Sequence, residues 1–168
     1  CSSDLILVAK GCFKVGLYKQ GLLHDMSKYS PTEFWVGAKY YQGTRSPNNA
    51  EREDIGYSSA WLHHKGRNKH HYEYWIDYSM QALPGGMAPV PMPDKYIAEM
   101  IMDRIAASKV YMGGEYTDRS PLDYYYQGTD RAPIHPETKA KLLYVLEMLA
   151  EEGEEKTFRF IKEELVQH

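Results

Sequence analysis

The 168-residue sequence predicts an all-α fold, a single compact helical domain of about seven helices spanning residues 1–168. Three observations predict this fold. Apolar side chains recur with a period of about 3.6 residues in several stretches. Serine-proline and asparagine pairs occur where such helices would begin. No stretch shows the sustained alternation of apolar and polar residues that is typical of a half-buried strand.

The first expected helix covers residues 4–19. Its inward residues fall on two stripes at helical spacing, Asp4, Val8, Cys12 and Val15 on one and Ile6, Phe13 and Leu17 on the other. We expect Cys12 to be a reduced, buried thiol, because the two cysteines of the chain cannot form the disulfide framework of a small secreted domain.

Two further helices are expected before residue 66. Ser30-Pro31-Thr32-Glu33 has the pattern of an N-cap, a proline in the first turn and a capping-box glutamate, which predicts a helix over 31–42. Asn48 and Asn49 are candidate N-caps for a helix over 50–65. That helix would carry Ile55, Ser59 and Leu62 on one face.

Prolines and glycines crowd residues 83–93, where we expect an exposed connection without regular structure that could act as a lid. The spacing of Ile97, Ile101 and Ile105 predicts a helix over 94–112, closed by Gly113-Gly114. A short helix is expected from Ser120 and a longer one from Pro136. The longer one and the segment after it would turn these residues inward: Leu142, Leu143, Leu146, Leu149, Phe158, Ile161 and Leu165.

Composition excludes several classes of protein. The net charge is only −3, and 15 Tyr, 8 Met and 3 Trp supply large side chains for a core, so the chain is not expected to be disordered. No run approaches the roughly 18 apolar residues of a membrane span, and the acidic balance argues against nucleic-acid binding. We therefore expect a soluble, cytoplasmic protein with no membrane or nucleic-acid partner, and the sequence leaves its oligomeric state open.

The histidines are unevenly distributed. Four of the seven lie within nine positions, at His63, His64, His70 and His71. Four imidazoles so close together would repel one another if protonated, and a bound cation would hold them neutral. The alternative is a polar surface turn.

Two other groups offer ligand chemistry. His24-Asp25 lies on a segment expected to be helical, and imidazole nitrogen with carboxylate oxygen suits a divalent ion. Asp103 lies among apolar residues of the helix over 94–112, where a carboxylate is costly to bury unless it is neutralised. An ion pair with Arg104 is the alternative role for Asp103.

The order of a His-Asp doublet, further histidines and a helical aspartate resembles the HD-domain superfamily of metal-dependent phosphohydrolases, which is all-helical. The doublet matches His24-Asp25, and the distant aspartate of that family best matches Asp103. More closely, the strings His24-Asp25-Met26-Ser27-Lys28-Tyr29-Ser30-Pro31 and Trp61-Leu62-His63-His64, continued by Arg67-Asn68 and His70-His71, look like an uncharacterised bacterial family known only as a domain of unknown function. That resemblance covers residues 5–155.

The resemblance implies one or two divalent ions per chain, of Mn, Fe, Zn, Co, Mg or Ni. The expected metal ligands are His24, Asp25, His63, His64, His70, His71 and Asp103. Lys28 and Arg67 would neutralise charge on a phosphate. Alternatively, Arg67 caps a helix C-terminus and Lys28 is a solvated cation.

Two features depart from the superfamily. Its first ligand is an upstream histidine, and residues 1–23 contain none, so that Asp4 or a residue before Cys1 would have to replace it. No Gly-Tyr-Pro follows the paired histidines, which argues against a cyclic dinucleotide substrate.

The expected function is that of a metal-dependent phosphohydrolase acting on a small phosphate ester or a nucleotide, with Lys28 and Arg67 as its catalytic cations. A di-iron oxygenase of the HD-like type is one alternative. A non-catalytic metal-binding or ligand-binding module is the other.

Overall fold

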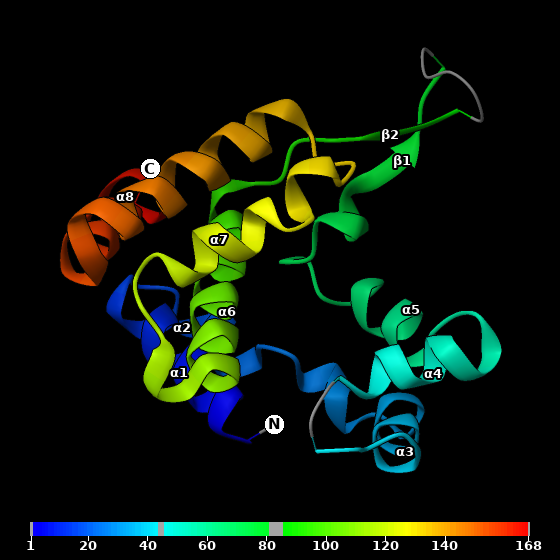
Figure 1. The fold of residues 1–168 in the computed structure, drawn as a ribbon. Helices are drawn as coiled ribbons and strands as arrows, with labels where there is room; N and C mark the ends of the chain where they lie inside the picture. The colour runs from blue at the N-terminus through cyan, green and yellow to red at the C-terminus, as the bar shows by residue number, and fades with distance from the viewer. Residues whose placement is uncertain (1, 44–45, 81–85, 168) are drawn as a thin grey trace.

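The computed structural model describes residues 2–43, 46–80 and 86–167 (Figure 1), and within these ranges it is all-α apart from one small hairpin. The α-helices are α1 (Ser2–Lys14), α2 (Tyr18–Leu23), α3 (Pro31–Lys39), α4 (Pro47–Ile55), α5 (Ser59–Lys65), α6 (Asp94–Met112), α7 (Ser120–Tyr126) and α8 (Pro136–Phe160). Shorter helical segments are η1 (Met26–Tyr29), η2 (Tyr72–Trp75), η3 (Gly113–Glu115), η4 (Thr129–Arg131) and the π-helix η5 (Ile161–Val166). The predicted fold class is confirmed.

The core is built around α6, which lies at the centre of the molecule and packs against α1, α8 and η5 (Figure 1). Its bounds agree with the predicted helix over 94–112, and Ile97, Ile101 and Ile105 are buried as their spacing predicts. From α8, Leu142, Leu146 and Leu149 are fully buried against it. A helix surrounded on several sides is a rigid platform for any polar side chain that it carries.

The predicted helix over 4–19 is two helices, because Gly16 adopts a positive φ of 88° and turns the chain between α1 and α2. The stripe of Val8, Cys12 and Val15 is fully buried, and burial raises the pKa of the Cys12 thiol to about 12, so the prediction of a reduced, buried thiol is confirmed. The prediction that the second stripe faces inward is wrong in part, since Ile6 and Phe13 are exposed and Leu17 is buried.

The predicted helix over 50–65 is also divided. Gly56 takes the left-handed conformation (φ 86°) at the end of α4, and the Ser58 side chain then accepts a bond from the Trp61 amide to begin α5. Ile55 and Leu62 therefore do not share a buried face, and both are exposed. The turn packs α5 against α3, so α3, α4 and α5 form a group on one side of the molecule (Figure 1).

The expectation of an irregular, exposed connection over 83–93 is wrong in part: Val90, Pro91 and Pro93 are exposed and lie outside regular structure, but residues 87–89 form a strand. Strand β2 (Met87–Pro89) pairs antiparallel with β1 (Ile76–Tyr78), with Ile76 opposite Pro89. Met92 is buried, and its amide donates to Thr138 Oγ1 at 2.9 Å. Strands this short carry too little alternation to be found from sequence. Residues 83–85 of the expected lid lie outside the described residues.

Among the described helices, none combines the length and the apolar character needed to cross a bilayer.

The close approach of α1 and α2 predicts opposite effects on stability for alanine at Gly21 and at Gly37. A Cβ at Gly21 would lie 2.8 Å from Phe13 Cε1 and 3.0 Å from Cys12 Cβ, whereas a Cβ at Gly37 of α3 would meet nothing within 4 Å. We expect Gly21→Ala to lower the free energy of unfolding by about 1–3 kcal/mol through overpacking. Gly37→Ala should raise it by about 0.5–1 kcal/mol, because alanine is the better helix former.

Urea denaturation of the two variants measures both effects. Equal stability of Gly21→Ala and the parent would contradict the packing of α2 on α1.

Candidate metal centre

The prediction that the His24-Asp25 doublet lies on a helix is wrong, because the doublet lies between two helices. His24 follows the last residue of α2, and Asp25 precedes η1 in a left-handed conformation (φ 55°, ψ 24°). Asp25 is the one non-glycine residue with a positive φ in the described part of the chain. Such strain is tolerated best by Asp and Asn, and where it occurs it is often part of a functional site.

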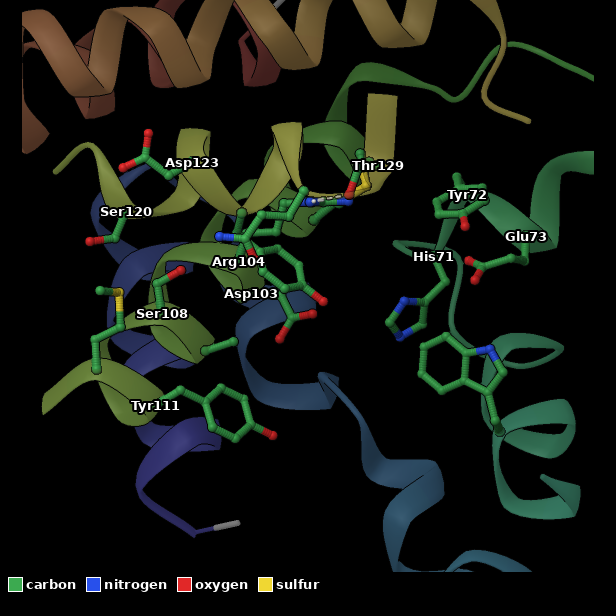
Figure 2. Close-up of a pocket in the computed structure, with 16 residues that line it drawn as sticks. His71, Tyr72, Glu73, Asp103, Arg104, Ser108, Tyr111, Ser120, Asp123 and Thr129 are labelled. Carbon is green, nitrogen blue, oxygen red and sulfur yellow. Dashed lines mark hydrogen bonds between the residues drawn. The ribbon is translucent and has the colours of Figure 1, made fainter. Parts of the chain in front are cut away.

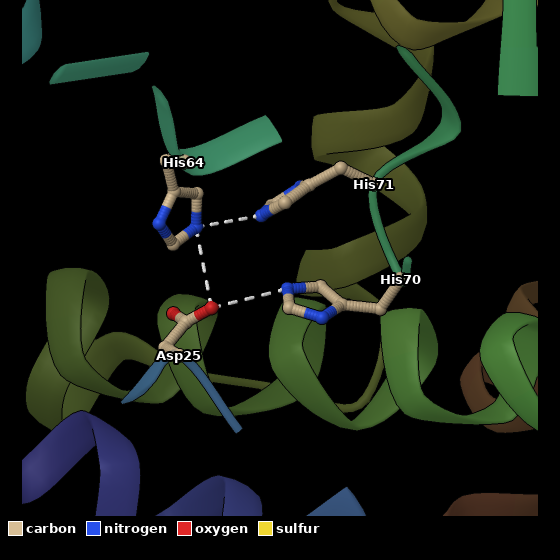
Figure 3. A group of neighbouring side chains, drawn as sticks. All are labelled: Asp25, His64, His70 and His71. Atoms are coloured by element: carbon tan, nitrogen blue, oxygen red, sulfur yellow. Dashed lines mark hydrogen bonds and ion pairs between the residues drawn. The ribbon is translucent and has the colours of Figure 1, made fainter. Parts of the chain in front are cut away.

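Three imidazoles point their Nε2 atoms at the Asp25 carboxylate (Figure 3 shows two of them). The Nε2 atoms of His64 and His70 lie 3.2 Å and 3.3 Å from Asp25 Oδ1. His24 Nε2 lies 3.4 Å from Asp25 Oδ2 and 3.5 Å from Oδ1 of Asp103, which reaches the group from α6. The doublet, the histidine cluster and the helical aspartate therefore meet at one place.

His71 completes the group. Its Nε2 lies 2.9 Å from His64 Nε2 (Figure 3), and its ring packs edge-on against Trp61. Six of the seven predicted ligands thus fall into three overlapping sets of close donor atoms: Asp25, His64, His70 and His71; His24, Asp25 and Asp103; and His24 and His70 together with Glu99. Asp25 belongs to two of the sets, so its carboxylate is placed to serve one ion or to bridge two.

Glu99 was not among the predicted site residues, but it orients two of the imidazoles. Its Oε1 lies 3.0 Å from His24 Nδ1 and 3.1 Å from His70 Nδ1. A carboxylate that accepts the Nδ1 proton leaves the Nε2 lone pair of the same ring free to bind a metal, and metal-ligating histidines are commonly held in this way. The signal in the sequence is weak: Glu99 lies one helical turn before Asp103, on the same face of α6.

Glu33 holds the Nδ1 atoms of two further imidazoles, those of His63 and His64. Its Oε2 lies 2.8 Å from His64 Nδ1, and its Oε1 lies 2.7 Å from His63 Nδ1. The predicted N-cap is present, since Ser30 Oγ accepts from the Glu33 amide, but the Glu33 carboxylate binds the histidines. His63 shares Glu33 with His64 and lies outside the three sets of close donor atoms, so the structure does not bring this predicted ligand to the centre.

The donor atoms fit a divalent ion. His24 Nε2, His70 Nε2 and Asp25 Oδ1 are buried and have no hydrogen-bond partner among the described residues. Two ligand atoms that each lie about 2.1 Å from one ion are roughly 3.0 to 3.4 Å apart in octahedral and tetrahedral sites. The Nε2–carboxylate distances of 3.2–3.5 Å are close to this spacing. Mixed imidazole and carboxylate ligands suit Mn, Fe, Co, Ni and Zn.

The charges of the centre are strongly coupled. Burial opposes the charge on His24, but the nearby carboxylates of Asp103 and Glu99 outweigh it and raise its pKa to about 10. Burial likewise opposes the charge on Asp103, yet His24 brings the pKa of that carboxyl down to about 2. The pKa of Asp25 is lowered well below its ordinary value against the effect of burial, by the close contact with His64 and the charge of His24. Both aspartates are therefore ionised at neutral pH, as metal binding requires.

The two predicted catalytic cations lie at the edge of the centre. Lys28 Nζ is 2.6 Å from Asp25 Oδ2 and 3.6 Å from Asp4 Oδ2, so it is a partner of the carboxylates and not a solvated cation. Asp4, the suggested substitute for the missing histidine, lies outside the three sets of close donor atoms. Arg67 is exposed and donates to the His63 carbonyl at 3.3 Å, which is the helix-capping alternative.

A cavity of about 700 Å³ adjoins the centre, and His71 and Asp103 form part of its wall (Figure 2). The side chain of Asp103 is 23% exposed, whereas that of Asp25 is 3% exposed, so solvent reaches the centre from the Asp103 side. Arg104 does not form the ion pair considered above, because its Nη1 donates to Thr129 Oγ1 at 3.3 Å while Asp103 faces His24.

The raised pKa of His24 predicts how stability depends on pH in protein stripped of metal. The folded state holds the His24 proton with a pKa of about 10 against an ordinary value of 6.5. The stabilisation is therefore complete below pH 6.5 and is lost as the pH rises through 10. We expect the melting temperature of chelator-treated protein to fall over this range, and His24→Gln to flatten the fall.

Thermal unfolding at several pH values measures this, with His135→Gln as the control because His135 caps α8 away from the centre. Added divalent ion should restore stability at high pH, since the ion takes the place of the proton. A melting temperature that rose over this pH range would contradict the arrangement.

A family described as a family of unknown function (DUF5662) matches residues 5–148 of the chain. The comparisons with curated proteins and with solved structures find no match. Because the matched region spans most of the 168 residues, the chain belongs to this family of unknown function, DUF5662.

Proposed function

We propose that this protein is a metal-dependent phosphohydrolase of HD-like type that cleaves a small phosphate ester or a nucleotide. The observation that carries the proposal is the orientation of the imidazoles. The Nε2 atoms of His24, His64 and His70 face Asp25, while buried glutamates hold the Nδ1 atoms of the same rings. A divalent ion bound there would polarise a phosphoryl oxygen and would lower the pKa of a water molecule.

The residues of the centre have separable tasks in this reaction. Glu33 and Glu99 fix the tautomers of the rings that they hold. Asp25 and Asp103 supply the negative charge that a divalent ion requires. Lys28, bonded to Asp25 Oδ2, positions that carboxylate. In the overall hydrolysis, water oxygen bonds to phosphorus, the ester P–O bond breaks, and the alcohol leaves with a proton.

His71 belongs to both the metal group and the cavity wall. Burial, together with the charge of His70, holds its pKa well below the ordinary value. The ring is therefore neutral at pH 7 and is able to accept a proton or to bind an ion. Its place in the wall supports substrate entry from the cavity, on the side where Asp103 is also exposed.

An oxygenase remains the second candidate, because four histidines (His24, His64, His70 and His71) and the shared Asp25 offer the ligand types of a di-iron centre. Elemental analysis of protein purified without oxygen separates the two functions. Less than one iron per chain, with activity supported by Mn or Zn, would remove the oxygenase.

Catalysis should depend on the metal ion and on both aspartates of the centre. Chelator-treated protein should not hydrolyse p-nitrophenyl phosphate, and one or more of Mn, Mg, Fe, Co, Ni and Zn should restore the activity. Asp25→Asn and Asp103→Asn should each lower kcat/KM by about 100-fold or more, because each removes an ionised ligand. The matched control is Asp77→Asn on the exposed face of β1, which should act like the parent. Equal rates in all three variants would refute the proposal.

Glu99 should affect the affinity of the centre for its metal ion. Glu99→Gln removes the negative charge from the group that accepts from His24 and His70, so the affinity for the activating ion should fall by about 10- to 100-fold. Calorimetric titration with the ion measures this, and Glu115→Gln on the exposed η3 is the control. An unchanged dissociation constant for Glu99→Gln would show that the glutamate does not orient the ligands.

A further inference from the structure

Two charged side chains in the cavity wall each keep a buried polar atom without a partner. Arg104 Nε and Glu73 Oε2 have no hydrogen-bond partner in the described ranges, and both residues line the cavity beside the metal centre. We propose that Arg104 and Glu73 are specificity-determining residues that select a sugar or polyol phosphate, with Arg104 binding the phosphate and Glu73 accepting from its hydroxyl groups. This inference rests on the proposed phosphohydrolase function.

Arg104 is the cation placed to meet the phosphate. Among the described residues that line the cavity it is the one lysine or arginine, whereas Lys28 is bonded to Asp25 and Arg67 to a helix carbonyl. It follows Asp103 in α6, so it lies beside a metal ligand that is exposed to the cavity. Its Nη1 donates to Thr129, and the half-buried guanidinium as a whole lines the cavity, where it can donate to a phosphate oxygen.

Glu73 supplies the opposite chemistry. It belongs to η2, directly after the histidine cluster, and its carboxylate points into the cavity from the wall that faces Arg104 (Figure 2). The carboxylate is half-buried in this wall, so a ligand that brings a hydroxyl group gains a hydrogen bond that is partly shielded from water. An alkyl phosphate has no such donor for the Glu73 carboxylate.

The remaining wall fits a polyhydroxylated compound. Trp61, Tyr111 and Tyr124 contribute aromatic surfaces, and Ser108 and Gln127 contribute polar groups that both donate and accept. The cavity volume of about 700 Å³ is larger than a phosphate group needs, which leaves space for the alcohol portion of an ester. A wall with donors, acceptors and aromatic faces matches the alternating hydroxyl groups and C–H surfaces of a sugar.

The experiment compares two esters of equal chain length, glycerol 3-phosphate and 1-propyl phosphate, with p-nitrophenyl phosphate as the generic substrate. The metal-loaded parent protein should favour glycerol 3-phosphate over 1-propyl phosphate by about 100-fold in kcat/KM, because the site loses hydrogen bonds with the alkyl ester. Glucose 6-phosphate tests a larger polyol, and phosphoethanolamine tests an ammonium group at Glu73.

Variants assign the preference to the two residues. Glu73→Gln should reduce the preference for glycerol 3-phosphate over 1-propyl phosphate by about tenfold, through a lower kcat/KM for the polyol ester. Arg104→Gln should raise KM for every phosphate ester by about 10- to 100-fold, and Arg104→Lys should recover part of the loss. Asp123→Asn is the matched control, because Asp123 lines the same cavity but is exposed and paired with Arg119. Thermal unfolding reports whether each variant is folded.

Calorimetric titration of metal-free protein with glycerol 3-phosphate provides a readout that does not need catalysis. If metal-loaded protein hydrolyses p-nitrophenyl phosphate but shows no preference between the paired esters, or if Arg104→Gln and Arg104→Lys only lower the melting temperature, the inference is overturned and the proposed function stands. If no ester is hydrolysed but glycerol 3-phosphate binds and Arg104→Gln abolishes binding, the hydrolase proposal fails and the recognition pair is supported. If the protein neither hydrolyses an ester nor binds glycerol 3-phosphate, both proposals are overturned. A preference for phosphoethanolamine over glycerol 3-phosphate would overturn the polyol specificity in favour of an amine.

Discussion

Two buried carboxylates, each shared by two imidazoles, are the interaction on which the centre depends. Glu99 Oε1 contacts the Nδ1 atoms of His24 and His70, and the Glu33 carboxylate contacts those of His63 and His64. Without these acceptors the rings would be free to turn about their side-chain torsions, and their Nε2 atoms would have no reason to meet. A buried carboxylate costs several kcal/mol of free energy unless it is paired, so the histidines and the glutamates stabilise one another.

The fold supplies each partner from a different element. Glu99 and Asp103 lie one turn apart on α6, whose other faces are buried against α1 and α8, so their positions are set by the core. Glu33 comes from α3 and His64 from α5, two helices that pack together because Gly56 turns the chain. Asp25 reaches the middle of the group from a strained backbone between α2 and η1. Regular structure alone would not have placed it there.

The sequence predicted the structure well where the spacing of one residue type indicated both a helix and the side chains that it brings together. The isoleucine spacing of α6 predicted its bounds, and the clustered histidines with His24-Asp25 and Asp103 predicted six ligands that do meet. It failed where a turn decided the outcome, as at Gly16 and Gly56, because a left-handed glycine inside an apolar pattern resembles a helix interior. Glu33 and Glu99 were missed for a different reason. Each has an ordinary local role, in a capping box or on a helix face, and only the tertiary contacts reveal the second one.

The way in which the centre is enclosed decides which side chains can act on a reactant. The side chains of His24, Asp25 and His70 are almost completely buried, and Lys28 covers Asp25 Oδ2. Glu33 and Glu99 occupy the Nδ1 side of the rings. What is left open is the boundary formed by Asp103 and His71, which is also the wall of the cavity. A reactant that approaches from there meets Arg104 and Glu73 in the same wall as Asp103 and His71. In the proposed function, recognition and chemistry are therefore assigned to different residues, and a change at Arg104 or Glu73 would alter the substrate without disturbing the metal ligands.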